Sequence, residues 1–445
     1  MPKITHRKKR LSSFKLIVLG FAGVIVLGAL ILMLPFSSTA GVVTPFHEAL
    51  FTSTSAVCVT GLVVQDTGSY WSAFGQTVIL LLIQIGGLGV VTVAALFAML
   101  SGRKISLMQR STMQDAISAP KVGGIVRLTR FIVRGTFLIE LIGMIVMLPT
   151  FCGNYGFKGI WMAAFHSVSA FCNAGFDILG TAKNKYPSLT GYIGNPAINI
   201  TIMLLIIVGG IGFLTWDDIY TNKWHFKKYR MQSKVILVTT AILIIAPAVF
   251  FFFCDFTGLP LAERILASLF QSVTPRTAGF NTADLSAMTG SSKAIMTLLM
   301  LVGGSPGSTA GGMKTTTLAV LILSAFSVCR KKDDAEVCGR RIDGSAVKNA
   351  AAVAVMYFLL FFVGGIVIST AEGLPLSTCL YETASAVGTV GLTLGITPQL
   401  GVLSQLILIV LMYLGRVGGL TLIYAAVSNK NHSGAKLPLE KITVG

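Results

Sequence analysis

Apolar segments with the length of a membrane-spanning helix recur along the chain and leave it few ways to fold. A helix needs about 20 apolar residues to cross a bilayer, and eight segments are near this length. They are 14–36, 75–100, 126–149, 196–216, 235–254, 294–326, 349–371 and 402–427. The chain is 53% hydrophobic and only 12% charged, whereas soluble domains are about a quarter charged. We therefore predict an all-α polytopic membrane protein with eight transmembrane helices.

The placement of Lys and Arg predicts the orientation of these helices. Of the 35 basic residues, 27 lie in the N-terminal arm, in the C-terminal tail or in three alternate connections. Cytoplasmic loops of membrane proteins are enriched in Lys and Arg, so we expect both termini in the cytoplasm. Because the basic residues fall between apolar segments, the net charge of +18 does not indicate nucleic-acid binding. The expected surroundings are a lipid bilayer, namely the plasma (inner) membrane.

Four shorter apolar segments lie between successive pairs of predicted spans. They are 45–56, 159–170, 261–273 and 376–386. Each is too short to cross a bilayer, which favours re-entrant half-helices. An aromatic residue within each segment is followed by a small polar run and, just after the segment, by a glycine and an apolar residue. The pattern defines four repeats with boundaries 1–104, 105–230, 231–340 and 341–445.

The repeats predict four pore helices and four filter segments around one central pore, with pseudo-symmetric units of helix, pore helix, filter and helix. A half-helix that ends at mid-membrane presents the negative end of its dipole there, which favours a cation. An extended segment can then direct carbonyl oxygens at the ion. Glycines at 61, 175, 279 and 391 suit a backbone that needs positive φ or close approach. The alternative is that these glycines only pack helices.

A glycine-rich stretch interrupts the sixth apolar segment. Five glycines and Pro306 lie within 303–313, so regular helix is not expected there. Non-helical backbone at membrane depth is tolerated where it is packed in protein or lines water, which favours part of a polar pathway over an ordinary loop between two short helices. The inner segments of the other three repeats also carry glycine-rich marks, but we expect only the third to lose its helix.

Ionisable residues near the predicted pore form no catalytic constellation, and no enzyme is predicted. Glu48, Glu263 and Glu382 lie near the starts of the half-helices. They are expected to stabilise helix N-termini, or alternatively to attract cations at the outer mouth. Glu140, inside an apolar span, is expected to have a buried structural partner that the sequence does not identify.

The chain resembles the Trk/Ktr/HKT superfamily of potassium transporters, and most closely its KtrB-type membrane subunit. The resemblance covers nearly the whole chain and rests on the four glycines above, the 274–281 segment, the 303–314 break and the 415–419 segment. It implies potassium uptake through a filter of backbone carbonyls, with potassium at the filter as the only expected metal. Because residue 61 is glycine and not the serine associated with sodium permeation, potassium selectivity is expected.

The resemblance also implies partners. Family members of this type form homodimers on a cytosolic ring of RCK-type, KtrA-like subunits. The chain has no dinucleotide-binding glycine motif, so we expect nucleotide on the partner subunit and no cofactor on this chain. Sodium-dependent uptake is expected as well.

Carrying the family's roles onto this sequence gives a filter and a gate. The expected filter residues are Cys58, Val59, Thr60, Gly61, Cys172, Asn173, Ala174, Gly175, Arg276, Thr277, Ala278, Gly279, Gly388, Thr389, Val390 and Gly391. The expected gate residues are Gly303, Gly304, Ser305, Pro306, Gly307, Ser308, Thr309, Ala310, Gly311, Gly312, Lys314 and Arg416.

Arg416 is expected to add a positive barrier and to donate to carbonyls freed by the broken helix, since a buried arginine is costly without acceptors. Its alternative role is to hold neighbouring helices together. Two other functions stay open at this point. One is an alternating-access cation symporter, in which broken helices also occur. The other is a membrane enzyme or assembly subunit.

Overall fold

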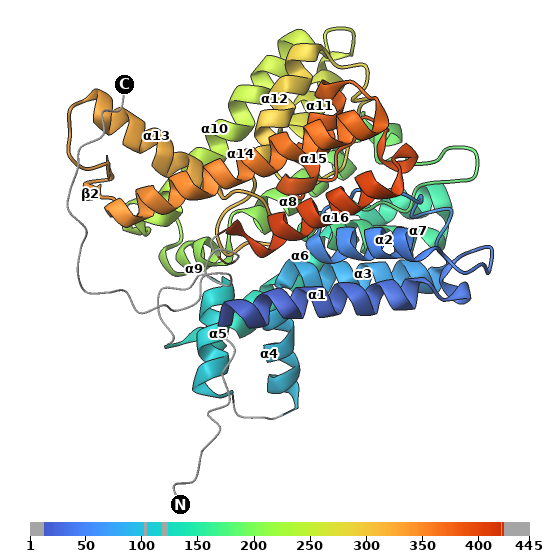
Figure 1. The fold of residues 1–445 in the computed structure, drawn as a ribbon, viewed down its shortest axis with the longest axis horizontal. Coiled ribbons are helices and arrows are strands. Elements are labelled where there is room, and N and C mark those ends of the chain that lie inside the picture. Colours follow the sequence, from blue (N-terminus) through green and yellow to red (C-terminus); the bar gives the residue numbers. More distant parts are fainter. Residues whose placement is uncertain (1–12, 102–104, 118–122, 420, 422–445) are drawn as a thin grey trace, which may run out of the picture.

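The computed structural model describes residues 13–101, 105–117, 123–419 and 421. The N-terminal arm, the C-terminal tail and the end of the 402–427 segment lie outside the described residues. In the described part, the chain is mostly helical, and one order of elements recurs four times. Each unit has a long outer helix, a short helix, an extended segment and an inner helix. The long helices run roughly side by side (Figure 1).

The helix bounds follow the predicted repeat closely. The outer helices are α1 (Ser13–Leu32), α6 (Ile125–Tyr155), α10 (Met231–Cys254) and α14 (Gly344–Glu372). The short helices are α2 (Phe46–Cys58), α7 (Lys158–Phe171), α11 (Leu261–Val273) and α15 (Leu376–Gly388). The inner helices are α3 (Ala73–Leu88), α8 (Pro196–Gly210), α12 (Gly290–Leu301) and α16 (Val402–Val417).

The remaining elements extend or connect these units. Helices that follow a break, or that lie in a connection, are α4 (Val90–Leu100), α5 (Leu107–Ile117), α9 (Phe213–Asn222) and α13 (Thr315–Cys329). Two strands, β1 (Glu336–Val337) and β2 (Arg340–Arg341), pair as an antiparallel hairpin. Short 3₁₀ turns are η1 (Pro35–Ser37), η2 (Thr190–Tyr192), η3 (Phe226–Lys228) and η4 (Thr397–Gln399). The helix α5 and the hairpin are additions that hydropathy did not predict.

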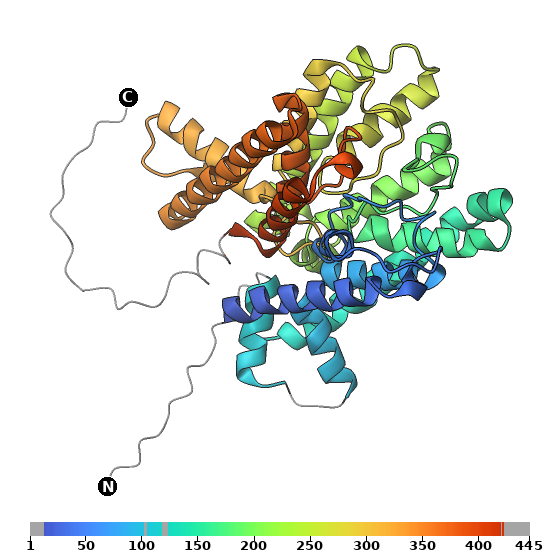
Figure 2. The same ribbon diagram turned by 45° about the vertical axis from the view of Figure 1, so that its right-hand side comes forward.

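Contacts between the units close into a ring. Each outer helix packs most extensively on the short helix that follows it. Each inner helix then packs on the short helix of the next unit: α3 on α7, α8 on α11, α12 on α15, and α16 back on α2. A view turned by 45° shows the first and last units adjoining each other on one side (Figure 2). Side chains therefore form one continuous core between units far apart in sequence.

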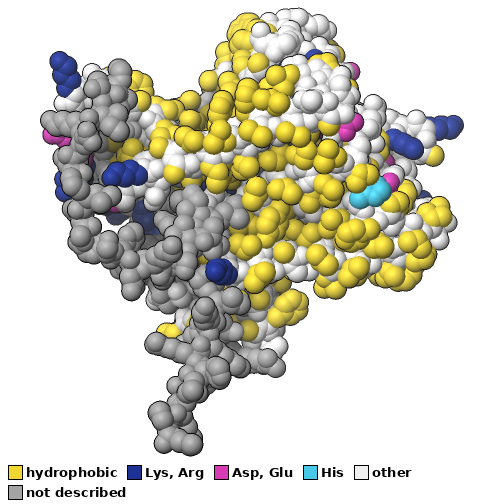
Figure 3. Space-filling view, viewed as in Figure 1, with side chains coloured by type: hydrophobic (Ala, Val, Ile, Leu, Met, Phe, Trp, Pro, Cys, Tyr) yellow, Lys and Arg dark blue, Asp and Glu magenta, His cyan; other side chains and the backbone are white. Residues whose placement is uncertain are grey.

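Among the described residues, four helices are each long and apolar enough to cross a membrane: α1, α6, α10 and α14. Two bent pairs, α3 with α4 and α8 with α9, pass the same test together. The surface carries a broad belt of apolar side chains, with Lys and Arg gathered toward the ends (Figure 3). The chain is therefore a multi-pass membrane protein.

Two predicted spans are not continuous helices. The 75–100 and 196–216 segments bend by 96° and 97° at Gly89 and at 211–212, and α16 ends at Gly418. Gly89, Gly212 and Gly418 share nearly one conformation, with φ of 84°, 92° and 87°. Only glycine adopts it at low cost. The expectation that only the third inner helix breaks is therefore wrong, because one such glycine redirects the chain without a long unwound loop.

The third unit differs in the length of its break. Helix α12 ends at Leu301 and α13 begins at Thr315, and the intervening residues 302–314, here called the break loop, form no helix. The five glycines and Pro306 explain this, since neither residue type supports a helix interior. The inner helices of the first two units thus break at Gly89 and at 211–212, the third breaks over a loop, and α16 ends before Gly418.

Candidate functional site

Each short helix is tied to the outer helix of its own unit by one hydroxyl group. The donor stands two residues after the aromatic residue of the repeat: Ser53, Ser167, Ser272 and Thr383. These hydroxyls donate to the carbonyls of Ile25, Glu140, Ile244 and Phe361, respectively. A buried hydroxyl and a helix carbonyl satisfy each other without water. The same bond in four units places the four short helices equivalently.

The segment after each short helix has an unusual backbone. Val59, Asn173, Thr277 and Thr389 have φ between 52° and 67°, and the glycine two residues later also has positive φ. Asparagine tolerates the left-handed region, but β-branched Val and Thr are strained there, at about 1–3 kcal/mol each. Such strain persists only where the surroundings fix the backbone, and it is common at functional sites.

The four glycines form a closed ring. A Cβ atom added to Gly61 would overlap the carbonyl oxygen of Ala174, and one added to Gly175 would lie 2.7 Å from that of Ala278. One on Gly279 would overlap the oxygen of Val390, and one on Gly391 that of Thr60. Each glycine therefore faces the carbonyl of the next unit, and the fourth faces the first. Both reasons for glycine apply here, because φ is positive and the approach is too close for a side chain.

A second set of hydroxyls fixes this ring from behind. Ser55 and Ser385 accept hydrogen bonds from the amides of Gly61 and Gly391, both at 3.0 Å. Ser169 and Thr274 instead donate to the carbonyls after their glycines, Phe176 and Phe280. All four hydroxyls stand four residues after the repeat aromatic. The small polar run in the sequence thus supplies two anchors per unit.

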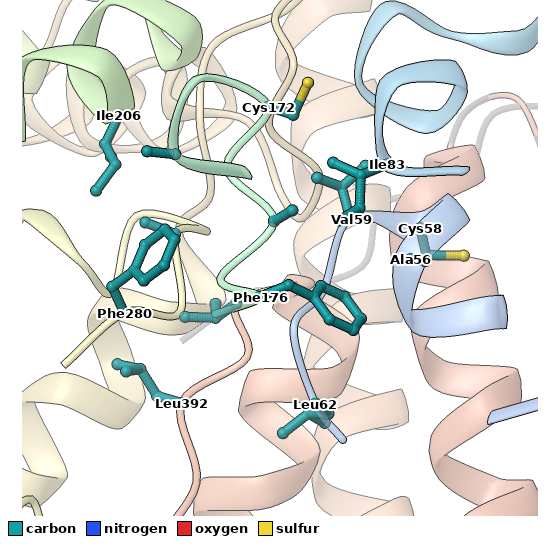
Figure 4. Close-up of a cluster of buried hydrophobic side chains, with 14 of the residues drawn as sticks. Ala56, Cys58, Val59, Leu62, Ile83, Cys172, Phe176, Ile206, Phe280 and Leu392 are labelled. Atoms are coloured by element: carbon teal, nitrogen blue, oxygen red, sulfur yellow. The ribbon is translucent and has the colours of Figure 1, made fainter. Parts of the chain in front are cut away.

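Apolar residues enclose the ring. Leu62, Phe176, Phe280 and Leu392 follow the four glycines and are at most 1% exposed. Figure 4 shows them on four separate segments that converge in the interior. Arg276 is the first residue of the third expected filter segment. Its guanidinium is directed away from the ring and donates to the Thr240 hydroxyl on α10. The ring is therefore lined by backbone and not by this charge.

The break loop joins the inner helices of three units. Ser305 and Thr309 donate from their amides to the carbonyls of Gly210 and Gly209 at the end of α8, at 2.9 and 3.2 Å. Gly312 donates to Gly415 on α16 at 3.3 Å. The carbonyls freed where helices end are thereby satisfied by the amides of the loop. The loop packs across the break of the second unit and against the fourth.

Arg416 adds the first unit to this assembly. Its guanidinium donates to the carbonyl of Thr309 in the break loop and to those of Gly86 and Gly87 at the end of α3. Lys314 donates from Nζ to Ala310 and Gly311 at 2.7 and 3.2 Å. A planar guanidinium with five donors suits several carbonyls at once. All four units thus meet at one layer, bridged by the loop and two cations.

One cavity adjoins the glycine ring and a second adjoins the break loop. One, of about 240 Å³, is lined by all four ring glycines together with Asp66 and Asp177. The other, of about 310 Å³, is lined by Gly89, Arg416, Gly418 and residues of the break loop. The glycine ring borders the first cavity, and the breaks in the inner helices border the second.

The carboxylates predicted near the short helices do not share one environment. Glu48 and Glu263 lie in the first turns of α2 and α11. Glu382 instead lies in the middle of α15 and is 0% exposed. It therefore does not stabilise the N-terminus of α15, and that expectation for it is wrong. Glu140 accepts a 3.3 Å hydrogen bond from Gln84, which is the partner that the sequence did not identify.

The sequence reasoning missed the left-handed residues before the glycines and the two rows of hydroxyl anchors. The anchors had a visible signal, since Ser or Thr recurs two and four residues after every repeat aromatic. The left-handed residues had almost none, because only Asn173 is of a type that favours this conformation. The acceptors of Arg416 in the first unit were also missed.

Four apolar helix units that close around a ring of backbone, with cavities on both sides, define the class of the protein as a multi-pass membrane transport protein. The family described as TrkH, cation transport protein, matches residues 14–433. This chain belongs to that family. It is a family of cation transporters and not of enzymes.

Full-length relatives carry transport names. The chain is 39% identical to the potassium/sodium uptake protein NtpJ of Enterococcus hirae, over 98% of both chains. It is 38% identical to the Ktr system potassium uptake protein B of Bacillus subtilis, over 92% of both chains. The crystal structure of the potassium transporter TrkH from Vibrio parahaemolyticus has the same fold, with a TM-score of 0.75 and 18% identity over 96% of this chain and 87% of the other.

Proposed function

We propose that this chain takes up potassium across the plasma membrane through a pore formed by four repeats within one polypeptide. Eight spans and four re-entrant pore helices surround the pore, with repeats at 1–104, 105–230, 231–340 and 341–445. The closed ring of Gly61, Gly175, Gly279 and Gly391 carries this proposal. Four equivalent backbone segments with short-helix C-termini behind them provide the electrostatic environment that a dehydrated cation requires.

The path has two stages. Potassium enters from the outer cavity and exchanges its water for carbonyl oxygens of residues 58–61, 172–175, 276–279 and 388–391. It then passes below the filter to the break loop, where residues 303–313, Lys314 and Arg416 form the gate. The contacts of Arg416 with two units support this role, because the exit cannot widen while they persist. Both termini lie in the cytoplasm, as the distribution of Lys and Arg suggests.

Partners control the gate in this proposal. The chain works as a homodimer on a separate cytosolic nucleotide-binding subunit of the RCK type. Two relatives are named as protein B of a Ktr system, and such a name suits one component of several. Sodium dependence is proposed on a similar basis, since one relative is named a potassium/sodium uptake protein.

An alternating-access symporter is the second candidate, and the breaks in the first three inner helices favour it more than the sequence did. Secondary transporters of this kind use broken helices at midplane sites. Their internal repeats are usually two-fold, whereas the ring here has four equivalent members. The ring therefore favours a pore.

Rubidium uptake into proteoliposomes tests the proposal. Wild-type protein should carry rubidium down its gradient, with potassium competing and sodium competing poorly. A variant without residues 305–311 should show raised uptake that no longer depends on the regulatory subunit. Absence of rubidium flux from correctly inserted wild type would contradict the proposed function. Flux with unchanged regulation in the deletion variant would contradict the gate alone.

A further inference from the structure

One position in the repeat holds four different polar residues. It directly follows the repeat aromatic and is occupied by Thr52, His166, Gln271 and Glu382. All four side chains are 0% exposed. They lie on the short helices that end at the ring, so this position forms a polar shell behind the filter segments. Only the fourth unit places a carboxyl group in the shell.

The fourth member differs from the others in its bonding. Thr52, His166 and Gln271 each have at least one buried polar atom without a hydrogen-bond partner. Glu382 accepts from the Thr393 hydroxyl, from the amide of Leu394 at 3.3 Å and from the Thr397 hydroxyl at 3.0 Å. The two threonine hydroxyls are also 3.0 Å apart. A single carboxyl group thus fixes the segment that leaves the ring in the fourth unit.

Among the described residues, no basic side chain forms an ion pair with this carboxyl group. None of the ion pairs among the described residues includes Glu382. Its titratable neighbours on α15, Cys379 and Tyr381, carry no positive charge. A buried carboxylate without a counter-charge is costly even when it is hydrogen-bonded. A cation in the adjoining pathway would supply the missing charge.

A short route connects the carboxyl group to that pathway. Thr393, which donates to Glu382, stands two residues after Gly391. Thr393, Gly391 and Gly395 all line the cavity outside the ring. The carboxyl group therefore acts on the ring and its outer cavity from behind, through one hydroxyl.

We propose that Glu382 is a positioning and selectivity-determining residue. It fixes residues 393–397, which follow the ring glycine of the fourth unit, and its negative charge stabilises a cation in the ring from one side. This inference rests on the proposed function, because it assumes that a cation passes the ring. It assigns the four units unequal electrostatic roles despite their equal backbone.

Two variants separate the charge from the hydrogen bonds. Glu382→Gln keeps the shape and most of the bonding but removes the charge. Thr393→Val keeps the charge and removes a hydroxyl that donates to Glu382 and accepts from the amide of Gly395 and the hydroxyl of Thr397. In rubidium uptake, Glu382→Gln should raise the half-saturating concentration about tenfold with little change in maximal rate. Thr393→Val should lower the preference for potassium over sodium with a smaller effect on half-saturation. Glu382→Asp should restore most of the affinity.

Moving the charge provides the sharpest test. Glu382→Gln combined with Gln271→Glu places a carboxyl group at the same position of the third unit. Partial recovery of the half-saturating concentration would support an electrostatic role. Wild-type half-saturation and wild-type selectivity in both Glu382→Gln and Thr393→Val would overturn the proposal.

If Glu382→Gln does not insert, unchanged selectivity in Thr393→Val would overturn the proposal instead. Wild-type protein without rubidium flux would mark failure of the proposed function, which these variants do not test.

Discussion

The glycine ring and the layer of broken helices are built from the same four units, but on different principles. In the ring, every unit contributes a left-handed residue, a glycine and two hydroxyl anchors in matching positions. In the break layer, the first, second and fourth units contribute Gly89, residues 211–212 and Gly418, whereas the third unit contributes the whole of 302–314. Equal contributions suit the coordination of a single ion. Unequal contributions allow one segment to rearrange while the others hold.

The first prediction concerns a change in one of the four equivalent glycines of the ring. Gly391→Ser introduces a Cβ that overlaps the carbonyl oxygen of Thr60, at a φ of 95° that serine rarely adopts. An overlap with added strain of about 3 kcal/mol corresponds to roughly a 100-fold change. We expect the ratio of potassium to sodium transport, measured by competition against rubidium uptake, to fall by at least this factor.

Gly373→Ala is the matched control for the ring. Gly373, directly after α14, has a φ of 67°, and no atom outside its chain neighbours lies within 4 Å of its Cβ position. It therefore shares the backbone strain without the overlap, and selectivity should stay near that of the wild type. Selectivity retained in Gly391→Ser would exclude the ring from ion selection.

The second prediction concerns the layer of broken helices. Arg416→Gln removes the bonds that join Thr309 to Gly86 and Gly87. Without them the loop is held less firmly, so uptake in the absence of any cytosolic partner should rise about tenfold, as expected for a coupling free energy of 1–3 kcal/mol. Arg341→Gln, at an exposed pair with Asp334, should have no such effect. An equal response of the two variants would argue that Arg416 only holds helices together.

The third prediction compares ring anchors between units. Ser385→Ala leaves the amide of Gly391 without its acceptor, a loss of about 1–3 kcal/mol in a buried site. Selectivity measured by rubidium competition should fall about fivefold, and Ser55→Ala should match it because the two anchors are equivalent. Thr370→Ala, which removes an exposed hydroxyl on α14, is the control. A large effect from one anchor and none from the other would show that the ring is not equivalent.

The fourth prediction concerns the bends and has the smallest effect. A Cβ on Gly212 would lie 2.7 Å from the carbonyl oxygen of Pro306, whereas one on Gly89 would lie 4.0 Å from its nearest neighbour. Both positions carry the same backbone strain, so Gly212→Ala should cost about 1 kcal/mol more than Gly89→Ala. Thermal unfolding in detergent should show a melting temperature that is a few degrees lower for Gly212→Ala. Equal melting temperatures would mean that the loop does not press on the second bend.

The sequence predicted the ring better than the break layer, for a physical reason. Each ring glycine follows the repeat aromatic of its unit, by ten residues in three units and by nine in the third, so the repeat isolates them. Gly89 and Gly212 lie in apolar runs where packing glycines are common, as Gly28 and Gly143 illustrate. A lone glycine that bends a helix by nearly 100° looks the same in sequence as one that lets two helices approach.

Contacts between units far apart in sequence were the other feature that the sequence could not predict. The bond from Arg416 to Gly86 joins residues separated by 330 positions. An arginine in an apolar span predicts that acceptors exist, and the break loop was a correct choice for one of them. That the others come from the first unit follows from the cyclic packing of α16 on α2, which no local pattern encodes.

The closure of Gly391 on Thr60 has a consequence for how the protein is made. A ribosome delivers the first unit long before the fourth, so a nascent chain in the membrane contains an incomplete ring. The last side of the ring is supplied together with α16, whose Tyr413 also donates to Val18 on α1 at 2.7 Å. The ring therefore closes only when nearly the whole polypeptide has been inserted.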